Sequence, residues 1–147
     1  MKNKGTVALC SSASFYRELL DVAGCLEKKG YKVIIPAAAG HMRKRGDFNV
    51  MHYKTWFKTP ADFKKKSALI KEHFREIKRS DKVLVLNYEK KGMKGYIGGN
   101  VLMEMAVAFF LKKPIYVINP VSKKSNLYEE IMAMQPRFLK RNLNNLK

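Results

Sequence analysis

Short apolar runs alternate with amphipathic segments along most of this chain. The runs are four to eight residues long and rich in β-branched side chains, which is typical of buried strands. The segments between them carry apolar residues at helical spacing, as in Phe15, Leu19, Val22, Ala23 and Leu26. The predicted strands are GTVALC at 5–10, YKVIIP at 31–36, DKVLVLN at 81–87 and PIYVINP at 114–120.

Four helices are predicted between and after these strands. Gly30 ends the first helix, in the position where glycine commonly stops a helix. The second runs from about Ala61 to Arg79, with an apolar face that includes Phe63, Ile70, Phe74 and Ile77. The third is VLMEMAVAFFL, which we expect to be mostly buried, and the last covers 126–134, before Pro136. The segment 37–60 has no firm periodicity and predicts a long loop, a lid or short irregular helices; loops of that length are often functional.

Strands that alternate with helices indicate a mostly parallel sheet covered on both faces. We therefore predict an α/β fold with four or five strands in a single domain over 1–136, followed by a basic tail over 137–147. Ligands of such sheets bind outside the carboxyl ends of the strands. The rim segments here are SSAS at 11–14, the stretch after Pro36, and the loops 87–100 and 119–125.

The chain is strongly basic, with 30 Lys and Arg against 12 Asp and Glu and a net charge of +18. Such a field attracts phosphate-bearing partners. The basic residues are scattered, and no RNP-like motif, zinc finger or basic helix accompanies them, so nucleic acid is possible but not favoured over a solvated basic surface. No apolar run is long enough to span a membrane, so we expect no membrane partner.

The two cysteines, Cys10 and Cys25, fit neither a CxxC spacing nor a ligand cluster. We therefore expect no metal site and a cytoplasmic location, where thiols stay reduced. The chain has neither a GxGxxG nor a GxxxxGK[ST] motif, and we expect no cofactor.

Glu104 is the leading candidate for chemistry, because this carboxylate stands between Met103 and Met105 in an apolar helix. Asn100 is a suitable N-cap for that helix. The structural alternative for Glu104 is a first-turn acid stabilised by the helix dipole, an effect below about 1 kcal/mol. A buried carboxylate costs more than that unless it is partnered, which favours a functional role.

Three further features carry weaker signals. The hydroxyls of SSAS precede a helix and suit either a phosphate site or simple N-capping. His73 borders the apolar face of the second helix, where a lone histidine is more often structural. In the 37–60 segment, Tyr53 and Trp56 fit a lid that stacks on a base, or equally aromatic anchors of a loop.

The segment DKVLVLN…KGYIGGNVLMEMAVAFFLKKPIYVIN resembles the nucleoside 2-deoxyribosyltransferase-like superfamily, which includes nucleoside deoxyribosyltransferases and 2'-deoxynucleoside 5'-phosphate N-hydrolases. The opening ALCSSASFYRELLDVAGCLEKKGYKVIIP fits the same pattern, so the resemblance covers the chain except 37–60 and the tail. It implies a flavodoxin-like three-layer fold and a nucleophilic carboxylate at Glu104.

The resemblance also implies roles for other residues. Ser11, Ser12 and Ser14 would hold a 5'-phosphate, with Tyr16 and Arg17 nearby. His73 stands where members of the superfamily carry an aspartate, Gly98 where they often have Asp or Ser, and Asn100 where glycine is common. The remaining expected substrate contacts are Asn87, Tyr88, Gly98, Gly99 and Asn100, and His73, Asn87 or Tyr88 would assist the leaving base.

The expected activity is cleavage or transfer of an N-glycosidic bond in a nucleoside or nucleoside 5'-monophosphate. By the same resemblance we expect a homodimer or larger homo-oligomer, with Ser122, Ser125 and Asn126 reaching a neighbouring site. Two alternatives stay open. One is a catalytically silent nucleotide-binding module or sensor, favoured by the changes at His73 and Gly98, and the other is a basic RNA-associated protein.

Overall fold

A central sheet of five parallel strands organises the protein, whose computed structural model describes residues 2–147. The strand order is β2-β1-β3-β4-β5, and every pairing is parallel. This is the flavodoxin-like order, so the predicted α/β fold class is confirmed. The strands are β1 (Thr6–Ser11), β2 (Lys32–Ile34), β3 (Lys82–Leu86), β4 (Ile115–Val117) and β5 (Arg137–Phe138).

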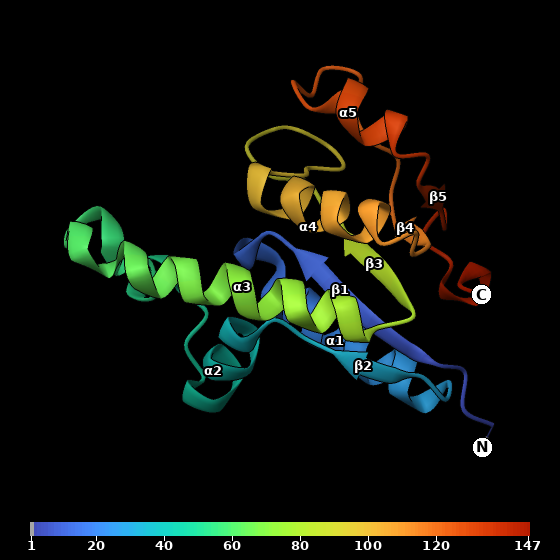
Figure 1. The fold of residues 1–147 in the computed structure, drawn as a ribbon, viewed down its shortest axis with the longest axis horizontal. Coiled ribbons are helices and arrows are strands. Elements are labelled where there is room, and N and C mark those ends of the chain that lie inside the picture. Colours follow the sequence, from blue (N-terminus) through green and yellow to red (C-terminus); the bar gives the residue numbers. More distant parts are fainter. Residues whose placement is uncertain (1) are drawn as a thin grey trace.

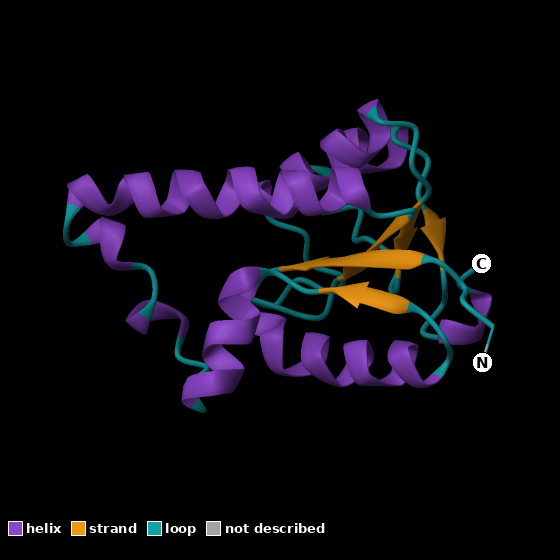
Figure 2. Ribbon diagram, turned by 60° about the horizontal axis from the view of Figure 1, so that its bottom comes forward, coloured by secondary structure: helices purple, strands orange, loops and turns teal. Residues whose placement is uncertain are grey.

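Helices cover both faces of this sheet, which makes three layers (Figure 1, Figure 2). One face packs on α1, and the opposite face packs on α3, α4 and α5. The N-terminal half of α3 extends beyond the sheet and carries the segment that precedes it (Figure 1). The helices are α1 (Tyr16–Lys28), α2 (Ala37–Arg45), α3 (Phe63–Arg79), α4 (Gly99–Phe110) and α5 (Tyr128–Ala133).

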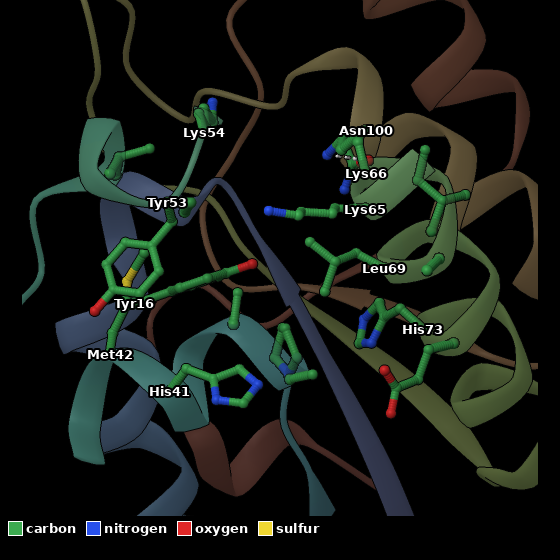
Figure 3. A pocket seen from close by; sticks show the side chains of 18 of the residues that line it. Tyr16, His41, Met42, Tyr53, Lys54, Lys65, Lys66, Leu69, His73 and Asn100 are labelled. Atoms are coloured by element: carbon green, nitrogen blue, oxygen red, sulfur yellow. Dashed lines mark hydrogen bonds between the residues drawn. The ribbon is translucent and has the colours of Figure 1, made fainter. Parts of the chain in front are cut away.

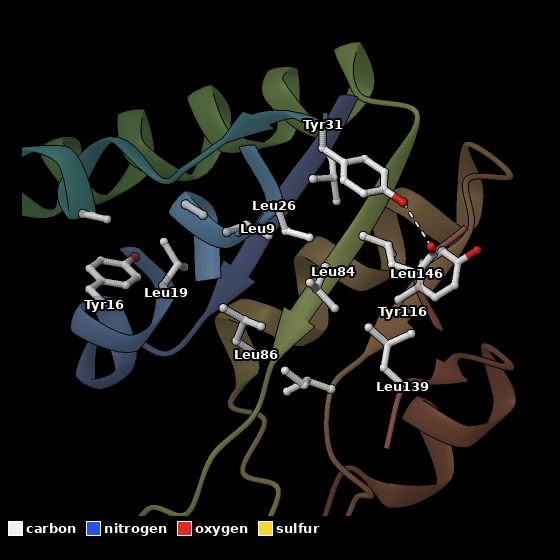
Figure 4. Packing of buried hydrophobic residues seen from close by; sticks show 14 of the residues in the cluster. Leu9, Tyr16, Leu19, Leu26, Tyr31, Leu84, Leu86, Tyr116, Leu139 and Leu146 are labelled. Carbon is white, nitrogen blue, oxygen red and sulfur yellow. Dashed lines mark hydrogen bonds between the residues drawn. The ribbon is translucent and has the colours of Figure 1, made fainter. Parts of the chain in front are cut away.

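The alternation of side chains along β1 divides the core into two clusters. Val7 and Leu9 pack on the α1 side (Figure 4), whereas Ala8 and Cys10 pack on the side of α3 and α4. All four side chains are fully buried, so the register of this strand is strongly specified. This alternation places the Cys10 thiol beneath α3 and α4, at the carboxyl end of the strand.

The segment 137–147, set apart above as a basic tail, packs against the sheet. Its first residues form β5, and Leu139 and Leu146 are buried in the α1-side cluster. The Tyr31 hydroxyl donates to the backbone oxygen of Leu146 at 3.0 Å (Figure 4). The basic side chains of this segment point outward while its leucines complete the core, so the folded unit extends past residue 136.

Several apolar positions differ from the helical faces expected above, and on α4 they include Met103 and Phe110, which are 41% and 84% exposed. Phe63 is 52% exposed at the start of α3, and Phe109 is 53% exposed on α4. The segment 37–60, for its part, contains α2 followed by short 3₁₀ turns at Val50–His52 and Thr55–Phe57, which matches the alternative of short irregular helices. These turns fold back beside α3 and form one wall of the cavity described next.

Candidate active site

A cavity of about 390 Å³ lies between α3 and the segment that follows β2. Tyr16, His41 and Tyr53 line one side, and Leu69 and His73 line the other (Figure 3). Its lining includes Ala13 shortly after β1, Pro36 shortly after β2, and Asn100 and Glu104 in the N-terminal half of α4. The cavity therefore lies on the rim where parallel sheets bind their ligands.

Glu104 lies at the wall of this cavity and is only 4% exposed. It occupies the second turn of α4, which begins at Gly99, so the first-turn dipole explanation does not apply. We expected Asn100 to be the N-cap of α4, but Gly98 holds that position. Asn100 instead lies one turn before Glu104, donates to its Oε1 at 2.7 Å, and accepts from Lys66 Nζ at 3.1 Å. The carboxylate is therefore held in place by its own helix.

His73 on α3 contacts Glu104 on α4. Its Nε2 lies 2.9 Å from Glu104 Oε2, and its Nδ1 lies 2.9 Å from Glu76 Oε2. Both ring nitrogens thus face carboxylate oxygens, and only the doubly protonated imidazolium can present a proton to each. The contact with Glu104 is a close ion pair without a well-aligned hydrogen bond, because Oε2 accepts none from any described residue.

The charges around His73 raise its pKa. Burial alone would lower the pKa of this ring, but the contacts with Cys10, Glu104 and Glu76 outweigh burial. The Cys10 thiol is itself neutral near pH 7, since burial and the Glu104 charge raise its pKa to about 12. The two carboxylates are therefore what keep His73 cationic.

Cys10 completes a compact cluster beneath the cavity. Its Sγ lies 3.5 Å from His73 Nε2, and the ligand atoms of Cys10, His73 and Glu104 all lie within 4.8 Å of one another. All three residues are buried. The expectation that Cys10 belongs to no cluster of potential ligands is therefore wrong for the folded protein. It was based on spacing along the sequence, where Cys10 has no such neighbours.

Tyr16 adds a protonated phenol to the same wall. Burial, followed by the Glu104 charge, raises the pKa of this hydroxyl above its ordinary value. The residue lines the cavity from the first turn of α1, directly after the SSAS loop. Among the expected substrate contacts in and directly after the SSAS loop, Tyr16 lines the cavity, whereas the three serines do not. Ala13 of that loop also lines the cavity.

Lys54 and Lys66 line the cavity, and Lys90 is close enough to Lys54 to sense its charge. Burial, and then the charge of Lys54, lowers the pKa of both Lys66 and Lys90. Within residues 2–147, no carboxylate forms an ion pair with any of these three lysines. Lys90 Nζ donates instead to Ser12 Oγ at 2.9 Å. Uncompensated ammonium groups that repel one another make a favourable environment for an anion.

Several expected contacts lie away from the cavity. Asn87 is fully buried and ties loops together, donating to the backbone oxygens of Gly95 and Asn119 while accepting from Asn119 N. Tyr88 packs edge-on against Phe15 at 5.4 Å and does not line the cavity. The other expected residues outside the lining are Ser11, Ser12, Ser14, Gly98, Gly99, Ser122, Ser125 and Asn126.

The loop after β4 contains the residues expected to reach a neighbouring subunit. Ser122 Oγ accepts from Lys124 N at 3.2 Å, and Ser125 Oγ accepts from Leu127 N at 3.1 Å. These contacts shape turns within the chain. A contribution of Ser122, Ser125 or Asn126 to another subunit stays a prediction.

Sequence reasoning missed Cys10, Lys54, Lys66 and Lys90 as members of the site region. The only available signal for Cys10 was its parity on β1, which places it on the same side of the sheet as the helices of His73 and Glu104. Tyr53 and Trp56 anchor the 37–60 segment, and stacking of either ring on a base stays a prediction. Trp56 is buried and the Tyr53 hydroxyl donates to Asp47 O at 2.8 Å, yet both residues line the cavity.

Comparison with known proteins adds no assignment: no protein-family model matches this chain, and no curated protein matches it either. Across residues 2–147, no helix combines the length and apolar character needed to cross a membrane.

Proposed function

We propose that this protein cleaves or transfers the N-glycosidic bond of a nucleoside or nucleoside 5'-monophosphate, with Glu104 as the nucleophile. The observation that carries this proposal is the buried Glu104 carboxylate at the cavity wall, held by Asn100 on one oxygen and facing His73 with the other. The earlier resemblance to the nucleoside 2-deoxyribosyltransferase-like superfamily points to the same side chain.

The chemistry follows from the charge that develops at C1' as the bond to the base breaks. A carboxylate beneath the sugar stabilises the oxocarbenium-like centre and then bonds to C1', while the base leaves with the bonding electrons and takes up a proton. Water or a second base then attacks C1', and the Glu104 carboxylate is released. A buried setting strengthens the attraction between the carboxylate and the developing charge.

The side chains around the cavity suit the parts of such a substrate. Its volume of about 390 Å³ lies within the range of roughly 300–1,000 Å³ typical of small-molecule sites. Tyr53 and Trp56 offer aromatic surface for a base. Asn100 lines the cavity and holds Oε1, so Oε1 is the oxygen that we assign to the attack on C1'.

Lysines at and near the cavity would bind a 5'-phosphate. Lys54 and Lys66 line the cavity, and Lys90 Nζ donates to Ser12 Oγ in the SSAS loop. Ammonium groups bind phosphate as point charges. These lysines favour a nucleoside 5'-monophosphate over a nucleoside as the substrate.

Assistance to the leaving base falls to donors at the cavity. Of the three donors expected from the sequence, His73 lines the cavity and Asn87 and Tyr88 do not. Tyr16 also lines it and keeps its phenolic proton, because the pKa of this hydroxyl is raised. We therefore assign the donor role to Tyr16 or His73.

A second candidate, a catalytically silent nucleotide-binding module, is favoured by one observation. The imidazolium of His73 already neutralises Glu104 at 2.9 Å, which reduces the charge available to an oxocarbenium-like centre. A module of this kind would use the same cavity and the same lysines but would leave the glycosidic bond intact.

The test is a screen of nucleosides and nucleoside 5'-monophosphates, with and without an acceptor base, followed by chromatography of liberated nucleobase. The proposal expects release of free base from at least one 5'-monophosphate, or base exchange when an acceptor is present. Calorimetry on the same compounds distinguishes the second candidate. Saturable nucleotide binding without any base release would replace the glycosidase proposal by the silent module.

A further inference from the structure

We propose that Cys10, His73 and Glu104 form a binding site for a thiophilic divalent cation, Zn²⁺ in the first instance. The site lies at the inner end of the cavity, and it stands on the geometry of these side chains whether or not the protein acts on nucleosides. A thiolate, an imidazole and a carboxylate are the three ligand types that zinc takes in proteins.

The spacing of the ligand atoms fits one small ion. Bonds of about 2.3 Å to sulfur and 2.0–2.1 Å to nitrogen place those two atoms roughly 3.5–3.6 Å apart at a tetrahedral angle. Cys10 Sγ and His73 Nε2 are 3.5 Å apart. His73 Nε2 and Glu104 Oε2 are 2.9 Å apart, and a zinc ion between them requires about 3.4 Å, an opening of about half an ångström.

The three ligand atoms that face this position contact one another: His73 Nε2 lies near both Glu104 Oε2 and Cys10 Sγ. Glu104 Oε2 is buried and accepts no hydrogen bond from residues 2–147, whereas Oε1 is satisfied by Asn100. Its contact with His73 Nε2 at 2.9 Å is an ion pair without an aligned hydrogen bond, so Oε2 keeps lone pairs that a cation could use. Asn100 and the helix fix the carboxylate so that its free oxygen points toward His73 and Cys10.

The hydrogen-bonding environment of His73 also resembles that of a metal-binding histidine. Metal-binding histidines usually donate their second ring N–H to a carboxylate, which fixes the orientation of the ring and raises its basicity. His73 Nδ1 meets Glu76 Oε2 at 2.9 Å, which leaves Nε2 for the ion. Because Glu104 and His73 also line the cavity, a water or ligand atom there can supply the fourth position.

The charges balance when the ion replaces protons. Before binding, the cluster holds a neutral thiol, an imidazolium and the carboxylates of Glu76 and Glu104, a net charge of −1. Zn²⁺ displaces the thiol proton and the Nε2 proton, both of which leave to solvent. The complex then holds Zn²⁺, a thiolate, a neutral imidazole and two carboxylates, again −1. Binding therefore leaves the net charge of a buried site unchanged.

The test uses full-length protein freed of metal with a chelator and titrated with Co²⁺, which reports its ligands by absorption. We expect one equivalent of Co²⁺ to bind with a thiolate-to-metal charge-transfer band, and Zn²⁺ to displace it. The band should disappear in both Cys10→Ser and Cys10→Ala and persist in Cys25→Ser, the matched control at the exposed thiol on α1. Glu76→Gln should weaken the affinity about 10–100-fold while keeping the band.

The wild-type titration decides the matter even where a Cys10 variant fails to fold. Absence of the charge-transfer band at one equivalent, or a band that survives in folded Cys10→Ala and vanishes in Cys25→Ser, overturns the proposal. These readouts follow the metal alone. A failure of base release in the screen above therefore leaves the metal site untouched, and a failure of Co²⁺ binding leaves the glycosidase proposal untouched.

Discussion

His73 on α3 and Glu104 on α4 are joined through Nε2 and Oε2 at 2.9 Å, in the wall of the cavity between α3 and the segment after β2. The ring also meets Glu76 through its other nitrogen, so one cation stands between two carboxylates. Removing one member of a buried ion pair leaves the other charge uncompensated. The resulting loss of stability exceeds the net stabilisation that the intact pair provides.

His73→Gln should therefore destabilise the protein at neutral pH. The expected loss in the free energy of unfolding is about 3–5 kcal/mol, since Glu104 and Glu76 lose their shared cation. Urea unfolding followed by circular dichroism measures it. His41→Gln is the control, because His41 is exposed and makes no ion pair or side-chain hydrogen bond with any described residue. Equal stability of the two variants would show that the His73 contacts are not stabilising.

The same pair predicts a pH dependence of stability. The pKa of His73 in the folded protein lies above its ordinary 6.5, so folding favours the bound proton. This contribution is complete below pH 6.5 and is lost as the pH rises toward the folded pKa. The facing groups are Cys10, Tyr16, Glu76 and Glu104, and the thiol and phenol titrate only in the alkaline range.

The difference in unfolding free energy between wild type and His73→Gln should accordingly be largest near pH 6 and shrink steadily toward pH 10. Metal-free protein in a chelating buffer isolates the proton effect. A difference that stays constant above pH 7, or grows over this interval, would mean that His73 is neutral in the folded state.

Lys54→Ala should weaken binding of a nucleoside 5'-monophosphate roughly tenfold, the effect of losing one charged phosphate contact. Binding of the matching nucleoside should change little, because that ligand has no phosphate. Lys64→Ala removes an equal charge from an exposed position outside the cavity lining and serves as the control. Calorimetry at two salt concentrations separates this local effect from the general field of the +18 chain. Equal losses in both lysine variants would place the phosphate elsewhere.

Gly95→Ala should disrupt the loop that leads into α4. Gly95 has a φ of +65°, and a Cβ there would clash with the backbone oxygen of Pro120. Gly92 provides a matched control, since its φ is +73° but a Cβ would meet open space. Gly92→Ala should cost about 1–2 kcal/mol for its left-handed backbone, and Gly95→Ala a further 1–3 kcal/mol or more for the clash. Thermal unfolding of both variants checks this, and equal melting temperatures would contradict it.

Much of the fold follows from periodicity, because strands buried on both faces read as short apolar runs and their helices as amphipathic stretches. β5 escaped that reasoning for a physical reason. It has two residues directly after Pro136, too short for any alternating pattern, and it is held by its pairing with Tyr116 and Val117. Phe63 and Phe109 show a second limit of prediction from periodicity. Helical spacing tells which side chains share a face of a helix, but not whether the rest of the fold covers that face.

Site residues could be predicted where the neighbouring sequence marks them. They could not be predicted where strand pairing alone brings them to the site. An acid among apolar helix residues marks Glu104, and the structure brings His73 to it. Cys10 joins them only because strand pairing places the end of β1 beside β3, where Cys10 stands opposite Val85. Nothing in a scattered set of lysines distinguishes Lys54 and Lys66 from the others before the chain folds.

The most direct test of the account is base release by Glu104→Gln, measured on whichever 5'-monophosphate the wild type cleaves. Gln keeps the size of the side chain but removes the anionic nucleophile. Glu130 is exposed on α5, so Glu130→Gln makes the same change away from the cavity. We predict that Glu104→Gln folds, still binds the nucleotide and loses base release by at least a thousandfold, the scale of a lost catalytic group, while Glu130→Gln matches wild type. Base release by folded Glu104→Gln at the wild-type rate would contradict the assignment of this carboxylate as the nucleophile.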